Sequence, residues 1–322
     1  MNRRIALFAG AALLAFGFTA WGQGNWPTRP IKVIVPFAAG GSTDIIARVT
    51  ATYLGKELGQ PVIVENVGGA AGALGTMQVQ NATPDGYTLA IATVSTMIVY
   101  PAAHPKPQYS LADFQPITNI ASMANIVSVG PTIKAKDLKE FIALLKASPG
   151  KYTFATSGVG SINHMLGESF QSQAGVKLVH VPYKGSGPGM QDVIGGQVDM
   201  IFDQFPSSKP QIDGGKMRGI GVISPSRIKG YDIMTMEEAG LKGFTDEAWY
   251  GLLAPGKTPP EVVAKLGEAM AKVEADPDFR SRIEAVGARP VGNTPAEFKA
   301  QIGQEIERMK KLVHERNIQL KD

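Results

Sequence analysis

A glycine pair followed by two hydroxyl residues stands at the start of the first helical pattern of the chain, and this order suits an anion. Gly40 and Gly41 come directly before Ser42 and Thr43. Glycine has no Cβ atom, so the backbone can turn sharply and approach a ligand. The first N–H groups of a helix have no partner and carry partial positive charge, which attracts phosphate or carboxylate. The loop therefore predicts an anion site, although an ordinary turn capped by its own serine or threonine also explains it.

The same construction occurs again far downstream, which favours the functional interpretation. A strand pattern over residues 151–156 runs into Ser157, Gly158, Val159, Gly160 and Ser161, and a helix pattern continues to about residue 174. Ser161 is the candidate cap of this helix. His164, on the first helical turn, either faces the ligand or packs against the protein.

Further loops at the ends of predicted strands are rich in amides and hydroxyls. A third glycine-rich loop runs from Tyr183 and Lys184 to residue 189, and Thr93 and Ser95 follow the strand at 87–92. Asp203 comes just after the strand at 199–202 and either lies at the carboxyl edge of the sheet or caps the next turn. Ligands of open α/β sheets bind at that edge. Such loops hold an anion rather than break bonds.

Other chemistries find little support in the sequence. Residues 251–258 match the phosphate-binding pattern G-x-x-x-x-G-K-T, but Pro259 and Pro260 lack the N–H groups that such a loop uses. The four histidines are scattered, so no metal site is expected. No serine lies in a G-x-S-x-G pattern, and no cofactor is expected.

Composition and the N-terminus indicate an exported globular protein. The chain has 322 residues, 44% of them hydrophobic and 19% charged, and it contains no cysteine. Arg3 and Arg4 precede an uncharged apolar run over residues 5–20, and small residues follow at 20–22. This pattern predicts a secretory signal peptide over residues 1–22, hence export. The net charge of +4 without clustered lysine and arginine gives no case for nucleic-acid binding.

Alternating strand and helix patterns predict a parallel, doubly wound sheet, because crossover helices connect parallel strands. The chain contains no solenoid repeat and no low-complexity linker. Strand patterns cover residues 31–35, 61–65, 87–92, 125–129, 151–156, 177–182, 199–202, 217–224 and 249–254, and helix patterns cover 43–58, 137–147, 161–174 and three proline-led segments that begin near 260, 277 and 295.

The motifs taken together resemble those of the Bug family, the periplasmic substrate-binding proteins of tripartite tricarboxylate transporters. The resemblance rests on Pro36-Phe37-x-x-Gly40-Gly41-x-x-Asp44, on Glu65-Asn66 with its glycines, on Ser157-Gly-x-Gly160-Ser161-x-x-His164, and on His180-Val-Pro-Tyr183-Lys-Gly185 followed by Gly196-Gln-Val-Asp199. The similarity covers essentially the whole chain after residue 22, with the motifs in the same order. One departure is Val67-Gly68, where the family commonly has a basic residue followed by proline.

The resemblance implies a type II periplasmic binding protein with two α/β lobes joined by two crossing segments and a ligand cleft between them. Lobe 1 would comprise residues 23–125 and 249–322, and lobe 2 residues 126–248. The protein would capture a small carboxylate as a monomer and deliver it to integral-membrane transporter subunits. A ligand-sensing partner of a signalling receptor and a secreted enzyme on the same fold are the alternatives. The expected ligand-binding residues are Phe37, Ala39, Gly40, Gly41, Ser42, Thr43, Thr93, Ser95, Ser157, Gly158, Val159, Gly160, Ser161, His164, Tyr183, Lys184 and Asp203.

Overall fold

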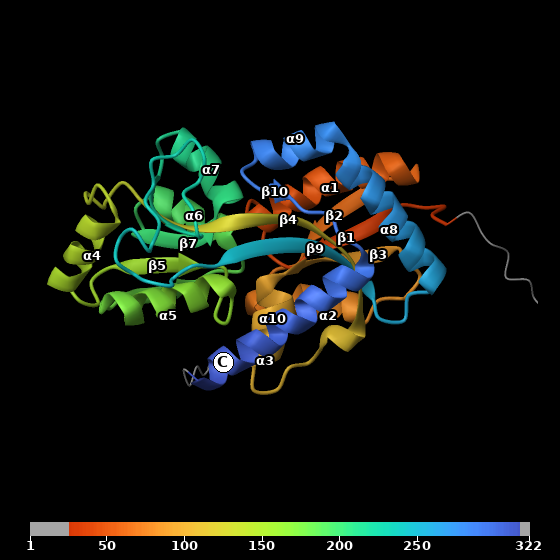
Figure 1. The fold of residues 1–322 in the computed structure, drawn as a ribbon, viewed down its shortest axis with the longest axis horizontal. Coiled ribbons are helices and arrows are strands. Elements are labelled where there is room, and N and C mark those ends of the chain that lie inside the picture. Colours follow the sequence, from red (N-terminus) through yellow and green to blue (C-terminus); the bar gives the residue numbers. More distant parts are fainter. Residues whose placement is uncertain (1–25, 316–322) are drawn as a thin grey trace, which may run out of the picture.

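Two long antiparallel strands, β4 (Phe114–Val129) and β9 (Glu247–Pro255), lie side by side through the middle of the molecule and join its two lobes (Figure 1). The computed structural model describes residues 26–315. The predicted signal peptide lies outside the described residues.

The first lobe is built on three parallel strands and the strands that continue their sheet. β1 (Ile31–Val35) pairs in parallel with β2 (Val62–Asn66) and β3 (Thr88–Thr93), and β3 pairs antiparallel with β9. The short β10 (Arg289–Pro290) pairs with β4. One face of this sheet carries α1 (Ser42–Leu58), α8 (Pro260–Ala275) and α9 (Pro277–Ala285), and the other carries α2 (Ala73–Gln80), α3 (Tyr100–Ala103) and α10 (Pro295–Glu315) (Figure 1).

The second lobe repeats this plan around the far end of β4. β5 (Thr153–Thr156) pairs in parallel with β6 (Val179–Pro182) and β7 (Met200–Gln204). β4 pairs antiparallel with β7 and with β8 (Arg218–Ile223). The helices are α4 (Leu138–Ala147), α5 (Ile162–Ala174), α6 (Ser186–Ile194) and α7 (Phe205–Asp213), and the short turns of the chain are η1 (Ala70–Gly72), η2 (Ser95–Val99) and η3 (Leu111–Asp113).

The two helices α1 and α5, which face the junction of the lobes, begin and end at residues typical of helix caps. The side chain of Ser161 accepts a hydrogen bond from the N–H of His164, so it caps α5 as the sequence predicts. The N-cap of α1 is Gly41, which offers no side-chain cap. Both helices end at a glycine in the left-handed conformation, Gly59 at φ 66° and Gly175 at φ 63°.

The two-lobe α/β fold is confirmed, but the sheet is mixed rather than wholly parallel. β4 and β9 run against their neighbours because both strands cross between the lobes. The strand predicted at 125–129 is only the last part of β4, which begins eleven residues earlier at Phe114. Asp203 lies within β7 and not just after it. The lobe boundaries at residues 125 and 249 stay a prediction.

The long helix α10 is anchored to the first lobe by Phe298. The ring of Phe298 is fully buried and lies edge-on to Trp249 of β9, with 5.2 Å between the ring centroids. Gly251 of β9 leaves the space that this ring fills, since a Cβ atom there would overlap it. The contact fastens the C-terminal helix to the strand that crosses between the lobes.

Replacing Phe298 by alanine should lower the free energy of unfolding by about 3–5 kcal/mol, because it removes a buried ring and leaves a cavity. Urea unfolding followed by circular dichroism measures this loss. The control is Lys299→Ala at the next, exposed position of α10, which should change the midpoint little. Equal midpoints for the two variants would contradict this role of Phe298.

Candidate functional site

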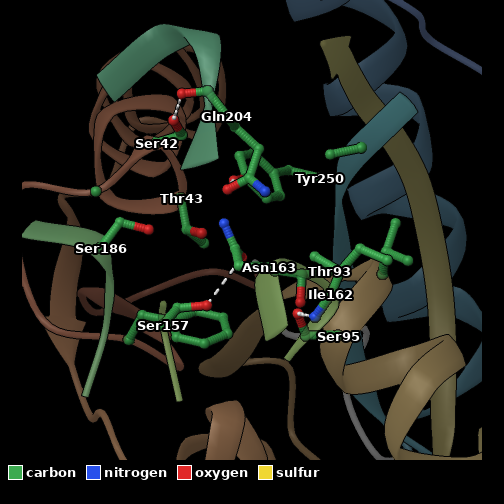
Figure 2. A pocket seen from close by; sticks show the side chains of 14 residues that line it. Ser42, Thr43, Thr93, Ser95, Ser157, Ile162, Asn163, Ser186, Gln204 and Tyr250 are labelled. Atoms are coloured by element: carbon green, nitrogen blue, oxygen red, sulfur yellow. Dashed lines mark hydrogen bonds between the residues drawn. The ribbon is translucent and has the colours of Figure 1, made fainter. Parts of the chain in front are cut away.

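A small cavity between the lobes brings together much of the predicted site. Its volume is about 20 Å³, roughly the room that one water molecule needs. Figure 2 shows hydroxyl and amide side chains from both lobes around it. The first lobe contributes Phe37, Gly41, Ser42, Thr43, Thr93, Val94, Ser95 and Tyr250, the second lobe contributes Ser157, Ile162, Asn163, Ser186 and Gln204, and Ala248 lies on the crossing strand β9.

The N-terminal ends of four helices meet at this cavity. Ser42 is the first residue of α1, Ile162 of α5 and Ser186 of α6, while Gln204 is the N-cap of α7. The sequence predicted only the α1 and α5 ends as anion sites. Each end brings N–H groups without intrahelical partners and partial positive charge. Four such ends together make a strong anion-binding environment.

None of the residues that line the cavity carries a formal charge. Their polar groups are the hydroxyls of serine, threonine and Tyr250 and the side-chain amides of Asn163 and Gln204. The apolar part of the wall consists of Phe37, Val94, Ile162 and Ala248. Such a wall can donate hydrogen bonds to an anion, but it offers no acid, base or activated nucleophile for catalysis.

Direct hydrogen bonds hold the two lobes together around the cavity. The N–H of Ile162 donates to Ser95 Oγ at 3.0 Å, and the Oγ atoms of Ser42 and Ser207 lie 2.6 Å apart. At the rim, the N–H of Ala38 donates to the carbonyl oxygen of Lys184 at 2.9 Å. Because all three bonds join the lobes, the structure is a closed form, and a ligand larger than water enters only when the lobes separate.

Glycines allow the backbones of the two lobes to touch. A Cβ atom on Gly187 of α6 would overlap the carbonyl oxygen of Ala39, and one on Gly68 would lie 2.5 Å from the carbonyl oxygen of Lys184. A Cβ atom on Gly185 would lie 2.7 Å from the backbone nitrogen of Ala38. Real Cβ atoms do not come so close, so these positions require glycine in the closed form.

A second depression at the rim contains four of the other predicted residues. Gly158, Val159, Tyr183 and Lys184 line it, and its volume is about 580 Å³. Ala70 and Ala71 face them from the first lobe, both with positive φ (48° and 50°), a strained conformation for alanine. These four predicted residues therefore lie at the mouth of the cleft and not at the inner cavity.

The remaining predicted residues support the inner cavity from behind. Gly40 lies at the turn before α1, where its N–H donates to Asp44 Oδ2, and Ala39 touches Gly187. Ser161 caps α5, and Gly160 donates its N–H to His164 Nδ1 at 3.2 Å. None of these four predicted residues, nor His164 or Asp203, lines either hollow.

Asp203 is fully buried one side chain behind the cavity. Its Oδ2 accepts a hydrogen bond from Ser207 Oγ at 2.5 Å, while Oδ1 has no hydrogen-bond partner among residues 26–315. Burial raises the pKa of Asp203 to about 6, and the nearby hydroxyls of Ser186 and Ser207 and the N–H of Gln204 offset part of that rise.

Four lining residues with polar side chains were not predicted: Asn163, Ser186, Gln204 and Tyr250. Ser186 belongs to the third glycine-rich loop, and Asn163 and Gln204 are next to the predicted residues His164 and Asp203. Including the whole of that loop and the neighbours of each predicted residue would therefore have identified these three. Tyr250 lies inside a strand and reaches the cavity through its pairing with Thr93 of β3. No local pattern indicates that.

A larger groove of about 910 Å³ runs between α5 and α10. None of the predicted site residues lines it, and its walls mix acidic and basic side chains, such as Asp246, Glu305 and Arg308. It shares Val94, Ile162 and Ala248 with the inner cavity. The candidate site is therefore the inner cavity, although the groove is larger.

His164 packs against the protein beneath the loop at 157–161. Its ring stacks on that of His180 with 4.2 Å between the centroids, and Thr156 Oγ1 lies 2.6 Å from His180 Nε2. Burial lowers the pKa of both histidines, that of His180 to about 4, where the neighbouring His164 adds to the effect. Both rings are therefore neutral at pH 7.

Protonation of this histidine pair at acid pH should lower the free energy of unfolding. In the unfolded chain His180 binds its proton near pH 6.5, but in the folded protein only near pH 4. Between these values the unfolded state holds more protons, so the free energy of unfolding should fall as the pH drops from about 6.5 to 4. Unfolding curves at several pH values test this. His180→Gln should make the free energy of unfolding fall less over this pH range, whereas His314→Gln on the exposed side of α10 should not. If the free energy falls as much in His180→Gln as in the wild type, other groups cause the pH dependence.

The sequence is similar to a known protein family and to several of its members. The chain matches the family model TctC, described as the tripartite tricarboxylate transporter family receptor, over residues 46–318. It is 36% identical over 326 residues to a UPF0065 protein of the TAR-I ttuE-ttuC' intergenic region of Agrobacterium vitis (98% of this chain, 92% of the relative). It is 35% identical over 300 residues to protein BugT of Bordetella pertussis (92% of both chains).

Solved structures give the same picture. A structure described as a periplasmic transporter has 48% identity and a TM-score of 0.88, with 92% of this chain and 100% of that chain covered. MatC of Rhodopseudomonas palustris with bound malate has 33% identity and a TM-score of 0.84 (89% and 99% covered). Another R. palustris protein, with adipate, has 30% identity and a TM-score of 0.86 (90% and 97% covered).

Proposed function

Because this chain belongs to the tripartite tricarboxylate transporter receptor family, we propose that it delivers a small carboxylate, captured in the periplasm, to integral-membrane transporter subunits. Receptors of this family are periplasmic solute-binding proteins. No helix within residues 26–315 is long and apolar enough to cross a membrane. We propose that the protein acts as a monomer that meets its membrane partner in the periplasm.

The meeting of four helix N-termini at a cavity without charged side chains is the observation that supports a carboxylate ligand. N–H groups and hydroxyls give charge-assisted hydrogen bonds to an anion without a buried lysine or arginine. Closing the lobes excludes water and strengthens these bonds. The malate and adipate in two related structures agree with this chemistry.

Delivery depends on the difference between open and closed forms. A ligand that contacts both lobes stabilises the closed form, and a membrane partner can distinguish the two forms by shape. The same chemistry suits a ligand-sensing partner of a receptor. Loss of carboxylate uptake on deletion of the gene supports transport, and unchanged uptake supports sensing.

A thermal-shift screen over dicarboxylates, tricarboxylates, amino acids and aromatic acids tests carboxylate capture. A ligand at 100 times its Kd should stabilise the native protein by about 2.7 kcal/mol. The matched controls are the amides of the same acids, which keep the size but lose the charge and should give no shift. The proposal is wrong if no acid raises the Tm, and conversion of an acid to a product would instead favour an enzyme.

Replacing Gly187 by alanine should hinder closure without unfolding the protein. The position lies in the first turn of α6, where alanine is a good helix former, but its Cβ atom would overlap the carbonyl oxygen of Ala39 in the closed form. Relief of such an overlap costs about 1–3 kcal/mol, so the Kd of a ligand found in the screen should rise about tenfold.

Gly303→Ala in α10 is the matched control, because a Cβ atom there meets nothing within 4 Å. Calorimetric titration gives the Kd values, and urea unfolding without ligand checks that both variants fold. Wild-type affinity in Gly187→Ala would show that binding does not need the backbone contact between Gly187 and Ala39.

A further inference from the structure

A chain of hydroxyl groups leads from buried Asp203 to the ligand cavity. Asp203 Oδ2 accepts from Ser207 Oγ at 2.5 Å, and Ser207 Oγ lies 2.6 Å from Ser42 Oγ. Ser42 lines the cavity as the first residue of α1 (Figure 2). The chain therefore begins at a titratable group in the second lobe and ends at a possible hydrogen-bond donor in the first.

Counting hydrogens fixes the direction of this chain while Asp203 is ionised. Each hydroxyl has one hydrogen, and a carboxylate can only accept. Ser207 gives its hydrogen to Asp203, so the short contact between the two serine oxygens needs the hydrogen of Ser42. Ser42 Oγ also accepts from the N–H of Ser207 at 2.9 Å. The Ser42 hydroxyl then has no hydrogen left for a ligand.

A proton on Asp203 reverses the direction. The carboxyl group now donates to Ser207 Oγ, and the hydrogen of Ser207 turns to Ser42 Oγ or to the carbonyl oxygen of Gln204, 3.1 Å away. The hydrogen of Ser42 is released, and an anionic oxygen in the cavity is a better acceptor for it than the Gln204 carbonyl oxygen at 3.2 Å.

We propose that Asp203 takes up a proton from solvent when a carboxylate binds, and that the Ser207–Ser42 hydroxyl chain then turns its last hydrogen toward the ligand. No bond between heavy atoms changes: a proton from solvent forms an O–H bond on Asp203, and the average uptake per bound anion is a fraction of a proton that depends on the pH. This inference rests on the proposed carboxylate capture and adds to it a linkage between binding and pH.

The surroundings of Asp203 support a proton rather than a counter-ion. Tyr250 of β9 is the titratable group that Asp203 influences, since the negative charge of Asp203 adds to the burial that raises the pKa of this phenol. β4 faces Asp203 with Ile126, and α6 contributes the uncharged Ser186. The charged side chains of the two helices beside it have partners of their own: Asp44 of α1 binds Arg48, and Lys209 of α7 binds Asp213.

The titration range of Asp203 makes both directions of the chain accessible near neutral pH. Its raised pKa of about 6 leaves it mostly ionised at pH 7, and an anion bound in the cavity in front of it opposes a second negative charge. If binding raises that pKa by about one unit, the affinity at pH 6 should be about fivefold higher than at pH 8. The Asp203 carboxyl group would then be protonated in most of the liganded molecules at pH 6.

Calorimetric titration tests this linkage. The ligands are malate, adipate and any acid found in the screen, and each is titrated at pH 6 and pH 8 in two buffers of different ionisation heat. We expect tighter binding at pH 6, after correction for ionisation of the ligand itself, and uptake of a fraction of a proton per ligand at pH 7. Equal affinity at both pH values, or binding without proton uptake, overturns the inference. If none of these acids binds at either pH, the proposed carboxylate capture fails instead.

Two variants separate the hydroxyl chain from simple charge repulsion. Asp203→Asn donates to Ser207 at every pH, so it should bind at pH 8 about as tightly as the wild type does at pH 6, without pH dependence. Ser207→Ala interrupts the chain and should lose most of the pH dependence while Asp203 remains. A pH dependence that persists in Ser207→Ala would refute the chain and leave repulsion alone.

Glu274→Gln is the matched control for these variants. Glu274 is a second buried carboxyl group whose pKa burial raises, here to about 7, but it binds Thr118 in the first lobe and does not line the cavity. Its replacement should change the pH dependence of unfolding and leave that of ligand affinity as in the wild type. If Glu274→Gln flattened the affinity profile, the linkage would not belong to Asp203.

Discussion

At the proposed site an anion would be held without a cationic side chain, so main-chain dipoles and hydroxyls would have to surround it. One helix N-terminus contributes a fraction of a charge, and its effect falls off within about one turn. Four helix ends therefore have to approach the same small volume, α1 from the first lobe and α5, α6 and α7 from the second. Strands β4 and β9 make this possible, because they carry two otherwise separate α/β units on one continuous sheet.

The glycines near these helix ends allow the backbones of the two lobes to come into contact. The sequence suggested that the backbone comes close to a bound anion at Gly40 and Gly41. In the structure these glycines face Ser186 and Gly187 across the junction, Gly41 also lines the cavity, and Gly68 faces the carbonyl oxygen of Lys184. A ligand in the proposed site would thus be enclosed by two backbones in contact. This explains why the inner cavity is small in the closed form, and why closure removes water from around the anion.

The order of strands and helices could be predicted from periodicity, but the longest strand could not. The first eleven residues of β4 include Pro116, the pairing has register shifts at Pro116/Thr118 and at Asn119/Ala121, and nearly all positions are buried, so no alternation of buried and exposed residues marks the strand. The loops at 40–43 and 157–161 were found because glycine and hydroxyl residues mark a helix start locally. Tyr250 was not found, since only its pairing across the sheet brings it to the cavity. His164 and Asp203 were found as residues, but the directions of their side chains depend on packing that no short pattern encodes.

In the proposed site, the groups that hold the charge differ from the side chains that shape the rest of the wall, and this difference affects specificity. In the proposed site the carboxylate is met by main-chain groups and hydroxyls, which do not depend on the identity of the rest of the ligand. Selection among acids then depends on the few side chains that complete the wall, among them Phe37, Val94, Ile162 and Tyr250. Substitution of these side chains changes the shape of the cavity without disturbing the helix ends that hold the charge. A fold of this kind can therefore keep one mode of anion capture while its relatives bind acids as different as malate and adipate.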